Sequence, residues 1–215
     1  MSTAQPPRFD EAALAQFEQL VAWRRDVRRF KPDAVDPALI DRLLALACLS
    51  PSVGNAQPWR FVKVESPERR AAIRANFVAS NAEALQDYHG ERARLYAGLK
   101  LSGLDVAPVQ IAVFCDGQTT AGYGLGRRTM PETMQYSVVA AIQTLWLAAR
   151  LLGLGVGWVS IIDPAALKAS LDVPDSWSLI AHLCIGYPVE ESDQPELVRY
   201  GWQAREDWAG LVMVR

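Results

Sequence analysis

The chain has 215 residues, half of them hydrophobic and 21% of them charged, and its formal net charge at pH 7 is −2. This composition excludes a disordered chain, and the near-neutral balance argues against general nucleic-acid binding, which needs a basic excess. The length allows one large domain or two small ones. Because no repeat or low-complexity linker interrupts the chain, we expect one domain over residues 1–215.

The first half of the chain predicts helices before strands. Asp10 and Asp36 each precede residues with helical apolar spacing, and both are predicted helix caps. A strand is expected over 59–65, and a capped helix over 66–77 follows it. Residues 80–100 look helical but polar, and we expect a mobile lid there.

The second half alternates buried strands with helices. Strands are expected at 109–116, 155–162 and 177–188, and helices at 132–152 and 163–171. The first of these helices is apolar nearly all round, which places it centrally or at a subunit interface. The tail, about 190–215, is too apolar to be loose and should wrap over the rest. This order predicts an α+β fold, with an α/β layer as the alternative.

A cluster of positive charge follows the first predicted helix. Its arginines are Arg24, Arg25, Arg28 and Arg29. Cations at the end of a helix offset the helix dipole, so these side chains could form a solvated helix end. The alternative is that some point inward, because Asp26 and the apolar Val27 and Phe30 lie among them. An inward arginine needs an anion such as a phosphate group.

A second polar segment, SPSVGNAQPW, spans residues 50–59. Its prolines and glycine are typical of an ordinary loop between a helix and a strand. Alternatively, the amides of Asn55 and Gln57 and the hydroxyl of Ser52 could bind a planar heterocycle with alternating carbonyl and N–H groups. The residues by themselves leave both interpretations open.

The cysteines and histidines predict no metal site. Cys48, Cys115 and Cys184 lie far apart, and neither His89 nor His182 has metal-ligand spacing to them. We expect Cys48 and Cys184 to be buried reduced thiols and His182 to be a core residue. The N-terminus lacks the apolar segment of a signal peptide, so a cytoplasmic location is expected.

Taken together, RRDVRRF and SPSVGNAQPWRF resemble the two FMN-binding segments of the nitroreductase-like flavoprotein family, with patterns R-x-S-x-R-x-F and A-P-S-x-x-N-x-Q-P-W. The later segments LLGLGVGWVSIIDP and LCIGYP are also similar to that family, so the resemblance covers about residues 15–205. It implies a mostly antiparallel sheet flanked by helices and a homodimer with exchanged tails. It also implies that FMN binds between the subunits.

Asp26 replaces the serine of the first pattern, and this change resembles the 5,6-dimethylbenzimidazole synthase branch of the family. That branch takes reduced FMN and dioxygen and releases 5,6-dimethylbenzimidazole, the lower ligand of cobalamin, with erythrose 4-phosphate. NAD(P)H would then serve only as the source of electrons for the flavin, either through a separate flavin reductase or by direct reduction of the flavin.

The resemblance assigns roles only to matching residues. The implied flavin contacts are Arg24, Arg25, Asp26, Val27, Arg28, Ser52, Asn55, Leu101 and Ser160. Arg24 would bind the phosphate with help from Arg199 or Arg205, and Arg28 would face the pyrimidine edge of the ring. Asp26 is expected to act as general base or anchor, with a pKa lowered by its arginine neighbours, and Ser160 to lie at the reactive face.

Two other functions fit the same motifs. An FMN-dependent NAD(P)H nitroreductase or quinone reductase would keep FMN bound and need an open pocket for the nicotinamide. A non-catalytic flavin-binding protein would need the phosphate and ring contacts but not Asp26 or Ser160. Formation of product from the flavin separates these three hypotheses.

Overall fold

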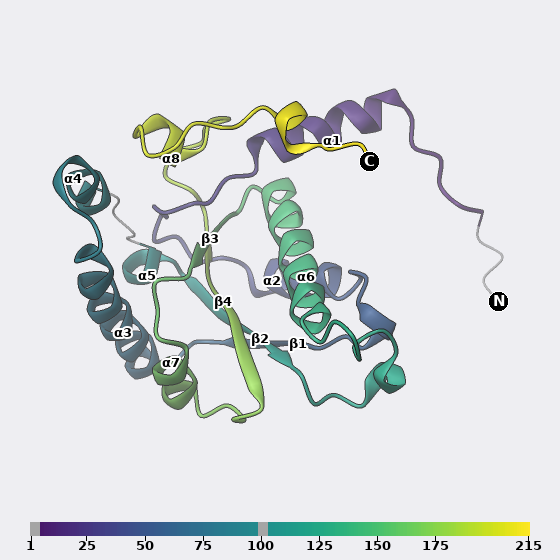
Figure 1. The fold of residues 1–215 in the computed structure, drawn as a ribbon, viewed down its shortest axis with the longest axis horizontal. Coiled ribbons are helices and arrows are strands. Elements are labelled where there is room, and N and C mark those ends of the chain that lie inside the picture. The colour runs from purple at the N-terminus through teal and green to yellow at the C-terminus, as the bar shows by residue number, and fades with distance from the viewer. Residues whose placement is uncertain (1–4, 99–102) are drawn as a thin grey trace.

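The structure is a computed structural model that describes residues 5–98 and 103–215. Its sheet has four strands: β1 (Trp59–Lys63), β2 (Val109–Asp116), β3 (Gly155–Val159) and β4 (Trp177–Gly186). The strand order is β1-β2-β4-β3, and every neighbouring pair is antiparallel (Figure 1). The expected α+β fold with a mostly antiparallel sheet is confirmed.

Helices surround this sheet. They are α1 (Glu11–Trp23), α2 (Pro37–Ala47), α3 (Pro67–Leu85), α4 (Gly90–Gly98), α5 (Gly103–Val106), α6 (Thr133–Leu151), α7 (Pro164–Leu171) and α8 (Glu196–Arg199). Short 3₁₀ turns lie at η1 (Val53–Asn55), η2 (Ala121–Gly124) and η3 (Trp208–Leu211). Side chains cap the starts of α1, α2, α3 and α7, because Asp10, Asp36, Ser66 and Asp163 each accept a hydrogen bond from a backbone N–H in the first turn.

Side-chain alternation along the strands divides the core between the two faces of the sheet. On β2, Ile111 and Val113 pack with α2 and α6, whereas Ala112 and Phe114 pack with α3 and α7. The long helix α6 is central, as its apolar composition predicts, with nine buried residues along its length. Among the described residues, no helix is both long enough and apolar enough to cross a membrane.

The structure differs from the sequence predictions at several points. The helix after β1 continues to Leu85, eight residues past its expected end, and so supplies the first part of the candidate lid. Cys48 is exposed rather than buried, because it follows the last turn of α2 and the apolar face of that helix points elsewhere. Cys184 is buried as expected.

His182 is a buried core residue, as predicted. Its Nε2 lies 3.1 Å from Gln110 Oε1, and its Nδ1 has no hydrogen-bond partner among the described residues. Burial lowers the pKa of His182 to about 4, from 6.5. Among the described residues, no three His, Cys, Asp or Glu side chains group as metal ligands.

This burial predicts that acid destabilises the fold before most carboxylates titrate. In the unfolded chain His182 takes up a proton near pH 6.5, and in the folded chain only near pH 4. The stability that the neutral imidazole contributes is therefore fully present above pH 6.5 and is lost as the pH falls towards 4. Urea unfolding should show a loss of about 2 kcal/mol between pH 6.5 and pH 5. In His182→Gln most of that slope should vanish, and an unchanged slope would contradict this assignment.

Candidate flavin site

The arginine segment lies along the outer edge of β3. The Val27 N–H donates to the Val156 carbonyl at 3.0 Å, and Asp26 forms a parallel bridge with Val156. This approach depends on Gly157, because a Cβ at that position would lie 2.2 Å from the Val27 carbonyl oxygen. The chain therefore covers its sheet edge with the residues that the FMN pattern singled out.

Asp26 points back onto the sheet. Its Oδ1 accepts a hydrogen bond from the Trp158 N–H at 2.9 Å, and Arg28 Nε lies 3.4 Å from its Oδ2. Its side chain is 37% exposed and lines a pocket described below. Burial raises the pKa of Asp26 and outweighs the Trp158 hydrogen bond and the charge of Arg28, both of which lower it. The expectation of a lowered pKa is therefore wrong, because desolvation prevails.

Arg24 and Arg25 lie where α1 meets α6. The Trp146 Nε1–H donates to the Arg25 carbonyl at 3.0 Å, and the Arg24 guanidinium lies 4.9 Å from the centre of the Trp146 ring. The Arg25 guanidinium turns back to donate to the carbonyls of Val21 and Ala22, so this side chain does form part of a helix end. The Nε atoms of both arginines are buried with no hydrogen-bond partner among the described residues.

Of the two candidate tail arginines, Arg205 lies with this pair. Burial is the main cause that lowers the pKa of Arg24 and of Arg25, and the nearby charge of Arg205 lowers both further. Arg199 instead donates to Glu190 at 3.1 Å. A pocket of about 240 Å³ is lined by Arg24, Arg25, Asp26, Arg28, Pro195, Glu196, Leu197 and Arg205. Like charges that converge on a pocket favour an anion in it.

Two glutamates that the sequence analysis did not single out neutralise the rest of the cluster. Glu190 and Glu196 both accept hydrogen bonds from Arg29, and Glu196 Oε1 lies 3.9 Å from Arg28 NH1. Backbone pairing brings Glu190 there, because the N–H of the preceding residue, Val189, donates to the Arg29 carbonyl at 3.1 Å. The signal in the sequence was an acidic stretch after the last strand, which has no fixed spacing to the arginines.

Ser160 lies on the same sheet edge as Asp26. It is the exposed residue that follows β3, two residues beyond Trp158 and thus about 7 Å farther along the strand. Asn76 of α3 holds the next turn through two hydrogen bonds with the backbone of Asp163, at 2.8 and 2.9 Å. One chain therefore presents Asp26 and Ser160 along a single edge.

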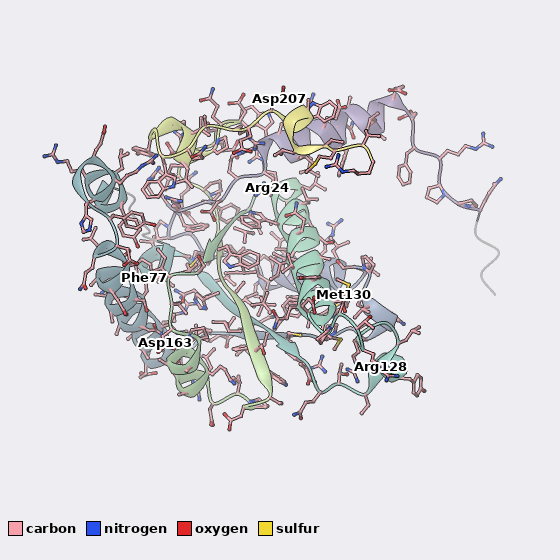
Figure 2. All side chains as sticks on the ribbon, viewed as in Figure 1. Arg24, Phe77, Arg128, Met130, Asp163 and Asp207 are labelled. Atoms are coloured by element: carbon pink, nitrogen blue, oxygen red, sulfur yellow. The ribbon has the colours of Figure 1, made fainter. Side chains whose placement is uncertain are left out.

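The second FMN-like segment lies elsewhere. The Val53 N–H donates to Ser137 Oγ at 3.0 Å, near the start of α6, whereas Trp146 contacts the arginine segment nine residues later. The two contacts are therefore about 13 Å apart along the helix. Figure 2 shows Arg24 near one end of α6 and Met130 near the other.

Within one chain, Ser52 and Asn55 thus do not join the arginine cluster. The Ser52 hydroxyl accepts from the Gln57 N–H at 3.0 Å, which holds the loop in shape, and the Asn55 side chain is exposed. Leu101, the remaining expected contact, lies outside the described residues.

The candidate lid contacts the tail through aromatic rings. Tyr88 stacks on Tyr96 with ring centres 4.8 Å apart, and Trp202 meets Tyr88 edge-on at 5.4 Å. The Arg92 guanidinium lies 5.2 Å from the centre of the Trp202 ring. Because Trp202 is three residues before Arg205, the lid and the arginine pocket share one segment of the tail.

Comparisons with known proteins identify the family of the chain. A family model described as Nitroreductase family matches residues 21–187. A protein from Rhodospirillum rubrum named 5,6-dimethylbenzimidazole synthase is 55% identical over 199 residues, which are 93% of this chain and 94% of that protein. One of the same name from Rhodobacter capsulatus is 50% identical over 195 residues, 91% of this chain and 94% of its own length.

A solved structure has a similar fold. It is oxidized iodotyrosine deiodinase bound to FMN and 3-iodo-L-tyrosine, with a TM-score of 0.71 and 24% identity over 92% of this chain and 97% of that one. From the family match over most of the chain and the identity to these relatives, the chain belongs to the nitroreductase family.

Proposed function

We propose that the chain is an oxygen-dependent enzyme that fragments reduced FMN to 5,6-dimethylbenzimidazole and erythrose 4-phosphate. The observation that carries this proposal is the position of Asp26, which lies inside the arginine cluster, is held by the Trp158 N–H and lines the pocket. The names of the two close relatives support it. Reduced FMN, when bound, supplies the electrons that react with dioxygen.

The arginine pocket fits the phosphate group of FMN. Arg24, Arg25 and Arg205 bring three positive charges together, and two of them have buried Nε atoms without a partner among the described residues. A phosphate dianion would accept hydrogen bonds from these groups and relieve their mutual repulsion. Arg205, rather than Arg199, therefore completes the site, because Glu190 already neutralises Arg199.

Asp26 and Ser160 are the groups that would handle protons. Burial raises the pKa of Asp26 and so brings it closer to the working pH. The carboxylate is therefore a stronger general base than it would be if only its arginine neighbours acted on it. Ser160 lies farther along the same edge, where its hydroxyl would hydrogen-bond to the ring. Val27 and Arg28 complete this wall of the site.

A second copy of the chain would supply the other wall. Ser52 and Asn55 lie near the far end of α6 from the arginine pocket, so a flavin that contacts both segments needs two subunits. An apolar groove of about 850 Å³ lies beside α1, and Leu14, Phe17 and Leu151 at its walls are at least half exposed. Burial of such a groove favours association. Sedimentation equilibrium should give twice the chain mass of 23.7 kDa.

The segment 80–100 would close the site against water. Its described part is the end of α3 and α4, joined to the tail through Trp202. A closed lid protects reactive intermediates from premature hydrolysis. Three further points stay predictions: the limits of this lid, the single-domain organisation over 1–215 with a wrapping tail, and the cytoplasmic location.

The deciding experiment is aerobic incubation of the purified chain with FMN, NADPH and a separate flavin reductase, followed by mass spectrometry. We expect 5,6-dimethylbenzimidazole to accumulate in step with the loss of FMN. If FMN survives while the chain itself oxidises NADPH, the nitroreductase or quinone reductase function replaces this proposal. If FMN binds and neither reaction occurs, the chain is a flavin-binding protein. An incubation without the reductase shows whether NADPH can reduce the bound flavin directly.

A further inference from the structure

A row of alternating charges connects Asp26 to the tail. Arg28 lies between two carboxylates, with its Nε 3.4 Å from Asp26 Oδ2 and its NH1 3.9 Å from Glu196 Oε1. Glu196 is in turn held by Arg29, which donates to its two oxygens at 3.3 and 3.1 Å. Glu190 also accepts a hydrogen bond from Arg29. The row therefore begins in the candidate site and ends on the first residue of α8.

Burial distinguishes the two glutamates. The side chain of Glu196 is only 9% exposed and that of Arg28 only 11%, whereas the side chain of Glu190 is 46% exposed. Charges that are largely removed from water interact over longer distances than exposed ones, because the surroundings screen them less. Glu196 can therefore act on Asp26, while Glu190 acts mainly on Arg29 and Arg199.

We propose that Glu196 is a positioning residue for the fragmentation reaction, acting through Arg28 on Asp26. Its carboxylate attracts the Arg28 guanidinium at NH1, whereas Asp26 attracts it at Nε, so the charge of Arg28 is shared between the two carboxylates. This inference rests on the proposed function, in which Asp26 takes up the proton. Without the charge of Glu196, Arg28 would stabilise the Asp26 carboxylate more strongly and make it a weaker base.

Other groups also face Asp26. From its own segment Arg24 acts as a second positive charge, and Arg205 of the tail lines the same pocket. From β3 comes the Trp158 N–H. From β4 comes Cys184, whose thiol stays neutral because burial raises its pKa to about 12. Among these neighbours Glu196 supplies the negative charge, and its effect is to raise the pKa of Asp26.

The test is Glu196→Gln, which keeps the shape and the hydrogen-bond acceptor but removes the charge. Product formation is measured in single turnovers, in which protein loaded with reduced FMN is mixed with oxygenated buffers between pH 5 and pH 9. The acid limb of the profile of rate against pH should move to lower pH by on the order of half a pH unit. FMN affinity should stay within about threefold, because the phosphate arginines are untouched.

The matched control is Glu190→Gln. It also removes a carboxylate that accepts from Arg29, but an exposed one, so the acid limb should stay in place. An equal shift in both variants, or no shift in Glu196→Gln, would overturn the inference.

A direct titration separates this inference from the proposed function. The carboxyl carbon of Asp26, identified by comparison with Asp26→Asn, can be followed by carbon-13 NMR without flavin. Its midpoint should lie at lower pH in Glu196→Gln than in the unchanged chain. Absence of that difference refutes the coupling, even if product forms. A shifted midpoint in a chain that makes no product would support the coupling and refute the fragmentation reaction.

Discussion

Asp26→Ser lowers the rate of 5,6-dimethylbenzimidazole formation by about 100-fold or more, because a positioned general base contributes roughly that factor at least. Serine is the residue of the common family pattern, so this variant should fold and still bind the flavin. FMN affinity should change by less than about threefold, because the three arginines assigned to the phosphate remain. The measurement is product per turnover beside a fluorescence titration with FMN.

Asp26→Asn is the matched control for the shape of the side chain. Its amide oxygen can still accept from the Trp158 N–H, which Asp26 does at 2.9 Å, but it cannot take up a proton. Loss of product in both variants supports a base. If Asp26→Asn keeps the normal rate, the residue only anchors the β3 edge, and if Asp26→Ser keeps it too, Asp26 has no role in the chemistry.

Arg205→Ala weakens FMN binding by about 10- to 100-fold, the usual worth of a hydrogen bond to a charged group. Its effect should be larger at low salt, because the interaction is between a guanidinium and a phosphate. Riboflavin, which lacks the phosphate, should bind the variant and the unchanged chain equally well. Fluorescence titrations with FMN and riboflavin at two salt concentrations check this expectation.

Arg199→Ala is the control on the same tail. Its guanidinium is paired with Glu190, whose side chain is nearly half exposed, so its loss should alter FMN affinity by less than about threefold. The reverse result, with Arg199 strong and Arg205 weak, would show that the tail takes another course when the flavin is bound.

Local patterns were enough to predict most elements. The caps at Asp10 and Asp36 and the apolar run of β2 carry their own signals, because capping and side-chain alternation depend on neighbours in the chain. Helical character was expected over 80–100, but its continuity with the helix over 66–77 was missed, since α3 buries only Ile73 and so carries no continuous apolar signal. Cys48 was misplaced for a related reason: an apolar neighbourhood in sequence does not say which way a residue after the last helical turn points.

Only part of the candidate site could be predicted from the sequence. The motifs identified Arg24 and Asp26 as members of one flavin-binding segment, because residue type and spacing carry that information. The pKa of Asp26 depended on how many protein atoms surround it, which only the packing against β3 decides. Only the folded position of the tail, which pairs through its backbone with the arginine segment, distinguishes Arg205 from Arg199 and places Glu196 beside Arg28. Charges that are some 170 residues apart in the chain interact only once the fold has removed them from water.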